Sequence, residues 1–188
     1  MRRMILNSNE LKSRLMTVVG TLILLAASAE AQDPKRQIVV SIPDRKLALL
    51  EDGEVKKIYP VAVGKEETPS PAGEFEIVNR LTNPTYYKPG TIVGPGASNP
   101  LGTRWIGLNQ KGYGIHGTNA PKSIGKAASH GCIRMAKKDL EELFTLVKVG
   151  DTVQIRAEKD DELAAIFGGS PDRMVVAQAQ TAQGAVGQ

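Results

Sequence analysis

The chain of 188 residues contains one cysteine, two histidines and few aromatic side chains. A single cysteine excludes an intrachain disulfide. Aromatic residues are 4% of the chain, so aliphatic side chains must supply most of the core, and the 41% hydrophobic content is sufficient for one. The apolar run at residues 15–27 is shorter than the ~20 residues that cross a bilayer as a helix. We therefore expect one folded domain and no stable membrane span after processing.

The N-terminus has the pattern of an export signal. Arg2 and Arg3 precede the apolar run, and Ala27-Ser28-Ala29 places small residues where a signal peptidase cleaves. We predict a signal peptide over residues 1–29 and a short linker over 30–35. Two alternatives to this cleavage are a second site at residues 29–31 and retention of the segment as an uncleaved anchor. The expected location is the periplasm or the cell wall.

Export also changes how the positive charge is interpreted. The formal net charge of the chain is +4. Residues 1–29 hold four basic residues and one acidic residue, so their removal leaves +1. The basic character is therefore partly a targeting signal, and no nucleic-acid partner is expected.

The remaining sequence predicts many short strands and one helix. Apolar residues at 140, 143, 144 and 147 follow helical spacing. Strands are predicted at residues 37–42, 46–51, 55–63, 74–79, 104–108, 114–116 and 152–156. This pattern favours a mainly-β sandwich or barrel-like domain over residues 36–156. Residues 157–188, first charged and then rich in Ala, Gln and Gly, are predicted to be a partly disordered tail.

A stretch without periodicity, residues 82–103, is rich in Pro, Gly, Asn and Thr. A loop of this length within a compact domain is often functional. Tyr86 and Tyr87 within it are candidate substrate contacts, and they are equally able to anchor the loop to the core.

Two segments contain the reactive side chains. One is Ile115-His116-Gly117, and the other is Ser129-His130-Gly131-Cys132-Ile133-Arg134. An unpaired thiol in an exported protein is a candidate nucleophile, and an imidazole beside it can accept its proton. Gly131 would leave room for a substrate carbonyl beside backbone N–H groups. Arg134 could bind a substrate carboxylate.

These segments resemble the L,D-transpeptidases of bacterial peptidoglycan, the YkuD family. The family motif is a His-Gly pair, a gap, and then Ser/Thr-His-Gly-Cys, an apolar residue and Arg or Asn. The resemblance covers about residues 36–156 and includes the loop at residues 68–73. It implies a barrel-like catalytic domain that acts on stem tetrapeptides, releases D-Ala and forms 3-3 cross-links during cell-wall biogenesis and remodelling.

The resemblance also implies residue roles. Cys132 would be the nucleophile, and His116 the general base and acid, oriented by the Gly117 carbonyl. His130 would shape the site with support from Ser129. The backbone N–H groups of residues 130–132 would form the oxyanion hole, and Arg134 would bind a carboxylate of the donor. Donor and acceptor stem peptides are the expected partners. A lipoprotein lysine, a D-amino acid or water, the last giving an L,D-carboxypeptidase, are alternative acceptors.

The same residues are open to other interpretations. Cys132 could be a buried hydrophobe and His116 a structural histidine. His116, His130 and Cys132 could bind zinc, but their spacing fits no common pattern. No papain-like segment surrounds the cysteine. A cell-wall binding module that has lost catalysis is a further alternative, although a binder has no need of a thiol. No motif indicates a cofactor, and no metal site is expected.

Overall fold

The computed structural model describes residues 33–168, and those from Pro34 onward belong to one compact unit. The strands are β1 (Arg36–Ser41), β2 (Lys46–Glu51), β3 (Glu54–Gly64), β4 (Gly73–Thr82), β5 (Tyr86–Lys88), β6 (Thr91–Val93), β7 (Arg104–Leu108), β8 (Gly114–His116), β9 (Ala127–Ser129), β10 (Ile133–Met135) and β11 (Thr152–Arg156). The helices are the 3-10 turn η1 (Pro121–Ser123), α2 (Lys137–Leu146) and α3 (Asp161–Phe167). The predicted signal peptide lies outside the described residues.

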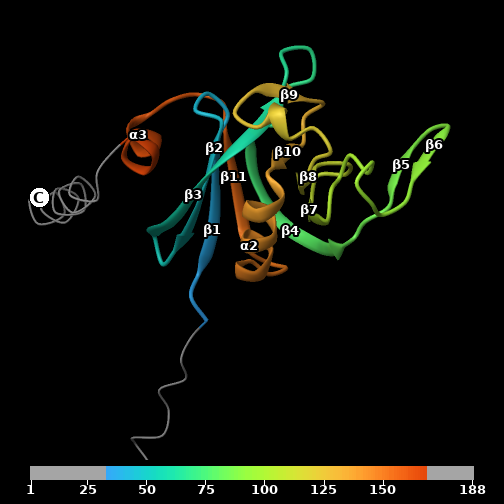
Figure 1. Cartoon of the computed structure of the whole chain (residues 1–188). Helices are drawn as coiled ribbons and strands as arrows, with labels where there is room; N and C mark the ends of the chain where they lie inside the picture. The colour runs from blue at the N-terminus through green and yellow to red at the C-terminus, as the bar shows by residue number, and fades with distance from the viewer. Residues whose placement is uncertain (1–32, 169–188) are drawn as a thin grey trace, which may run out of the picture. The chain divides into compact units, whose positions relative to one another are not determined.

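The main sheet closes on itself. Its order is β10-β8-β7-β4-β11-β1-β2-β3-β9, and β10 also pairs with β3 (Figure 1). Closure leaves the strand edges largely paired, which removes the exposed edges of an open sheet. The predicted mainly-β, barrel-like fold class is therefore confirmed.

The core follows from the alternation of side chains along the strands. Ile38 and Val40 of β1 and Leu47 and Leu49 of β2 are buried in the main hydrophobic cluster. Strand residues two apart share a face, so this set points to the same side of the sheet. Each such side chain stabilises the fold by about 1.5–3 kcal/mol relative to an exposed one.

Helix α2 packs on the same core. Leu140 and Leu143 are fully buried, as their spacing predicted. Phe144 is only partly buried, and the guanidinium groups of Arg80 and Arg104 lie 4.1 Å and 5.3 Å from its ring centre. The helix thereby holds β4 and β7 together through cation–π contacts as well as burial.

Helix α3 lies within residues 157–188, the predicted tail, and packs on the domain. Its N-cap Asp160 accepts a hydrogen bond from the Leu163 backbone N–H at 2.8 Å. Leu163 and Ile166 form a second buried cluster with Val39, Ala48 and Leu50 on the other face of β1 and β2. Both faces of these strands are apolar, so the second face requires a cover. No helix within residues 33–168 is long and apolar enough to cross a membrane.

The stretch at residues 82–103 contains secondary structure that the sequence did not predict. Strands β5 and β6 form a hairpin that projects from the main sheet (Figure 1). At its base, the buried Asn99 side chain donates to the carbonyls of Pro84, Val93 and Gly94 at 2.7–3.3 Å. One amide thus ties the chain before β5 to the end of β6.

Candidate active site

Three adjacent strands place Trp105, His116 and Arg134 in one cross-strand row. His116 of β8 lies opposite Trp105 of β7 and opposite Arg134 of β10. Their neighbours Ile106, Ile115 and Ile133 are buried in the core. Because successive residues of a strand face opposite sides, the row lies on the outer face of the barrel. The Trp105 and His116 rings are stacked, with centroids 5.7 Å apart.

The His116 ring is buried and held by its own strand end. Nδ1 lies 2.6 Å from the carbonyl oxygen of Gly117, the contact that the family resemblance implies. A carbonyl only accepts, so Nδ1 carries the hydrogen and Nε2 is free to accept a proton. Burial lowers the pKa of His116 to about 4, opposed by the Gly117 bond and reinforced by the charge of Arg134.

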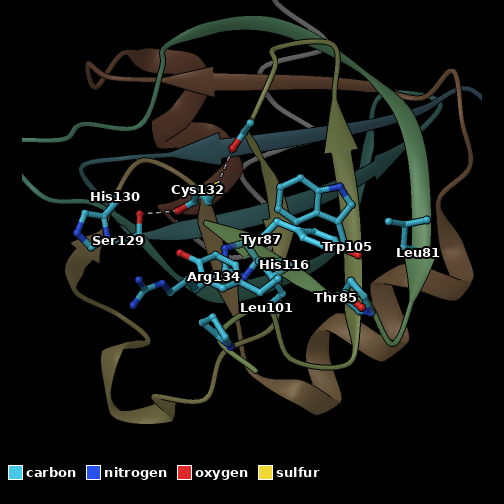
Figure 2. Close-up of a pocket in the computed structure, with 14 residues that line it drawn as sticks. Leu81, Thr85, Tyr87, Leu101, Trp105, His116, Ser129, His130, Cys132 and Arg134 are labelled. Carbon is cyan, nitrogen blue, oxygen red and sulfur yellow. Dashed lines mark hydrogen bonds between the residues drawn. The ribbon is translucent and has the colours of Figure 1, made fainter. Parts of the chain in front are cut away.

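Cys132 lies immediately before β10 and is partly buried. Its thiol donates to the carbonyl oxygen of Gly112 at 3.5 Å (Figure 2). Burial raises the pKa of Cys132, and a hydrogen bond from the Gly114 backbone and the charge of Arg134 lower it. The shifts at His116 and Cys132 both favour a neutral thiol beside a neutral imidazole when no substrate is bound.

The turn that carries Cys132 is closed by Ser129. The buried Ser129 hydroxyl donates to the Cys132 carbonyl at 2.6 Å and accepts from the Gly131 backbone N–H at 3.0 Å. Gly131 has a φ of +113°, and a Cβ there would lie 2.6 Å from Tyr113 Cε1. Glycine is required at this position by backbone conformation and by space.

The backbone N–H groups that are expected to form the oxyanion hole differ in their partners. The Gly131 N–H already donates to Ser129, so it is not available to a substrate oxygen in this conformation. The N–H groups of His130 and Cys132 have no partner among residues 33–168. His130 itself is exposed and lies at the edge of the site (Figure 2).

A pocket of about 430 Å³ joins these residues to the segment at residues 82–103. His116, Cys132 and Arg134 line it, and so do both predicted tyrosines, Tyr86 and Tyr87. Tyr87 is nevertheless 72% exposed. The other lining residues are Leu81, Pro84, Thr85, Pro100, Leu101, Trp105, Gly112, Ser129 and His130.

The Arg134 guanidinium has no ion pair or hydrogen bond within the described part of the chain. No residue that lines the pocket is acidic. An unpaired guanidinium in a partly enclosed pocket is suited to a carboxylate of a bound molecule.

The sequence did not identify Trp105, Tyr113 or Asn99 as site residues. Trp105 is the only tryptophan of the chain and shares a strand pairing with His116. Tyr113 is three residues before His116, but its contact with Gly131 depends on the pairing of β8 with β10. Among residues 33–168, no group of three or more His, Cys, Asp or Glu side chains is placed to hold a metal ion.

Residues 35–155 match the family model of the L,D-transpeptidase catalytic domain, YkuD. The chain belongs to this family. The match confirms the resemblance drawn from the His-Gly and Ser-His-Gly-Cys segments.

Curated relatives of this family are similar over the same part of the chain. YkuD of Bacillus subtilis is 47% identical over 118 residues, which are 63% of this chain and 64% of that protein. YqjB of the same organism is 42% identical and covers 63% of this chain and 69% of YqjB. YkuD of Bacillus licheniformis is 46% identical, and the match spans 64% of its length. All three carry an L,D-transpeptidase name.

Solved structures share the fold. A variant of the Enterococcus faecium L,D-transpeptidase with serine in place of a cysteine has a TM-score of 0.56 at 26% identity, and the match covers 65% of this chain and 50% of that one. A Mycobacterium tuberculosis L,D-transpeptidase has a TM-score of 0.57 at 20% identity and covers 65% and 58% of the two chains. The latter likeness concerns the fold alone.

Proposed function

We propose that this protein is a cysteine-dependent L,D-transpeptidase that cross-links peptidoglycan stem peptides. The proposal rests on the His116 imidazole, which lines the same pocket as the only thiol of the chain. Its Nδ1 is hydrogen-bonded to the Gly117 carbonyl, and its Nε2 is free to accept a proton. This arrangement supplies a base, a nucleophile and, in Arg134, a contact for a carboxylate. The family membership supports the same activity.

Acylation follows from these groups. His116 Nε2 accepts the Cys132 proton as sulfur attacks the carbonyl between the third stem residue and D-Ala. Both groups are neutral at rest, so proton transfer accompanies the attack rather than preceding it. The unpartnered N–H groups of His130 and Cys132 stabilise the oxyanion. The C–N bond then breaks, and D-Ala leaves with the proton that His116 returns.

The thioester on Cys132 is resolved by an acceptor. An amine on a second stem peptide attacks the carbonyl, its proton passes through His116 back to the sulfur, and a 3-3 cross-link forms. Water, a lipoprotein lysine or a D-amino acid would react with the same thioester. The L,D-carboxypeptidase reaction with water is part of the proposal as a side activity.

The proposal assigns the remaining site residues as follows. Ser129 and Gly131 shape the turn, and His130 forms its outer edge. Arg134 binds a donor carboxylate. Tyr86 and Tyr87 contact the bound peptide from the segment over the pocket, since both line it. Export to the periplasm or cell wall, where the substrate lies, is proposed from residues 1–29.

The decisive experiment uses tetrapeptide-bearing muropeptides. We expect the wild-type chain to release D-Ala and form a cross-linked dimer, detected by mass spectrometry, and a thioester adduct to be found on Cys132. Cys132→Ala, and His116→Gln with an intact thiol, should abolish both products. Product formation at the same rate by wild type and Cys132→Ala would contradict the enzyme and leave the binding-module alternative.

A further inference from the structure

Acidic residues are absent from the middle of the chain. Residues 77–138, which include His116 and Cys132, contain nine Lys and Arg residues and no Asp or Glu. All 20 acidic residues of the chain lie before or after this stretch. The basic residues are Arg80, Lys88, Arg104, Lys111, Lys122, Lys126, Arg134, Lys137 and Lys138.

Four exposed lysines of this stretch lie in the segments that connect pocket-lining residues, and we call them the rim lysines: Lys88, Lys111, Lys122 and Lys126. Lys88 follows Tyr87, and Lys111 precedes Gly112; both of these neighbours line the pocket. Lys122 and Lys126 lie in the segment that joins β8, which ends at His116, to β9, which ends at Ser129.

The rim lysines carry no counter-charge in the described part of the chain. None of the four forms an ion pair within residues 33–168. By contrast, Lys56, Lys65 and Lys159, outside the stretch, pair with carboxylates at 2.8, 3.5 and 2.7 Å. The four rim lysines therefore add uncompensated positive charge to the segments that carry pocket-lining residues.

Carboxylates near the site are already engaged. Glu67 pairs with Lys65 in the loop whose Thr68 hydroxyl donates to the Ser129 carbonyl. On α2, Glu141 accepts from Thr103, and Glu142 pairs with Lys57. Glu66 and Asp139 form no ion pair within residues 33–168, but neither lines the pocket. With no carboxylate in the pocket lining, the field at its mouth is positive.

We infer that the rim lysines bind carboxylates of neighbouring stem peptides on one peptidoglycan strand, so that the preferred substrate is a polymer with several stems rather than a single muropeptide. The inference rests on the proposed function. Several lysine–carboxylate attractions act together on one strand and raise its association rate. They are exposed and therefore screened by salt, whose Debye length is about 8 Å at physiological ionic strength.

The test compares two triple variants that change the charge equally, each made in the Cys132→Ala chain so that no turnover occurs. The rim variant replaces Lys88, Lys111 and Lys122 by Gln. The control variant replaces Lys35, Lys56 and Lys159, none of which lines the pocket. Binding of soluble glycan fragments with several tetrapeptide stems, and of single-stem muropeptide, is measured by calorimetry between low and high salt.

We expect the rim variant to bind the multi-stem fragments about tenfold more weakly at low salt, with the difference vanishing at high salt. The control variant should bind like the parent chain, and single-stem binding should change little in either. Equal binding by both triple variants, or no preference for multi-stem fragments, would overturn the inference. So would binding of inorganic polyphosphate to the rim without binding of the multi-stem fragments, which would indicate a phosphate polymer as partner.

The readout separates this inference from the proposed function. The Cys132→Ala chain can bind the multi-stem fragments whether or not the wild-type chain is a transpeptidase. When the three rim substitutions are made in a chain that keeps Cys132, that chain should release D-Ala from single-stem muropeptide at the wild-type rate. If the wild-type chain itself released no D-Ala from single-stem muropeptide, the proposed function would be contradicted instead.

Discussion

The Tyr113 ring lies directly against Gly131: a Cβ placed on this glycine would come within 2.6 Å of Tyr113 Cε1. Tyr113 immediately precedes β8, which carries His116, and Gly131 immediately precedes Cys132. This contact therefore links the two halves of the site. The positive φ of Gly131, +113°, directs the chain so that Ser129 can close the turn.

Gly131→Ala should lower kcat about 100-fold with a smaller change in KM, because displacing the turn by about 1 Å misplaces the nucleophile. Adding Tyr113→Ala removes the steric clash but not the backbone strain. The double variant should therefore recover only part of the activity. Full activity of Gly131→Ala alone would show that activity depends neither on the backbone conformation of residue 131 nor on the space beside Tyr113.

Ser129→Ala should destabilise the chain by about 1–3 kcal/mol, because it leaves the buried Gly131 N–H and the Cys132 carbonyl without their partner. Urea unfolding gives this value. The acylation rate should fall as well, since the turn positions Cys132. Ser129→Thr keeps the hydroxyl and serves as the matched control. Equal unfolding midpoints for the wild-type and Ala chains would contradict the closing role of the hydroxyl.

Arg134→Gln should raise KM for donors with a free carboxylate, while a donor amidated at that position should be affected little. Arg134→Lys keeps the charge but loses the fork of donors, so its effect should be intermediate. The charge of Arg134 also lowers the pKa of Cys132. Iodoacetamide alkylation of Arg134→Gln at mildly alkaline pH should consequently be slower. Equal KM effects on both donors would contradict carboxylate recognition.

Much of the site could be predicted because its residues are close in sequence and of rare types. The only cysteine and both histidines fall within 17 residues, 116–132. The His116–Gly117 contact is local and followed from the family motif. The contact between Tyr113 and Gly131 could not be derived, since it exists only after β8 and β10 pair in register.

The missed elements have physical explanations too. The β5–β6 hairpin is held by one buried amide, Asn99, rather than by an apolar pattern. Helix α3 was missed because its seven residues are too few for periodicity to be decisive. Two features of the sequence do indicate this helix. Asp160 is a suitable N-cap, and the apolar residues on both faces of β1 and β2 require a further element to pack on the second face.

Leu163→Ala in α3 should cost about 2–4 kcal/mol of unfolding free energy, because Leu163 is 1% exposed and packs on Val39 and Leu50. Glu162→Ala in the same helix removes only an exposed ion pair with Arg156 and should cost less than about 0.5 kcal/mol. Acylation of the folded Leu163→Ala chain should proceed at the wild-type rate, since α3 contributes nothing to the pocket lining. Equal stability of the two variants would place α3 outside the cooperative fold.

The burial of His116 makes stability depend on pH in a predictable direction. Its pKa is about 4 in the folded chain, against 6.5 for a free imidazole, so the unfolded chain binds more protons between these values. The unfolding free energy should therefore fall as pH decreases from about 6.5 to about 4, by a total of about 3 kcal/mol.

His116→Gln isolates this contribution, because glutamine is neutral throughout the range. Urea denaturation at pH 7, 5.5 and 4 should show a smaller loss for His116→Gln than for wild type, with the difference approaching about 3 kcal/mol. His130→Gln is the matched control, because it replaces the other histidine of the chain, which is exposed. Parallel profiles for wild type and His116→Gln would mean that the imidazole is not desolvated in the folded state, and the neutral resting pair proposed for the site would have to be abandoned.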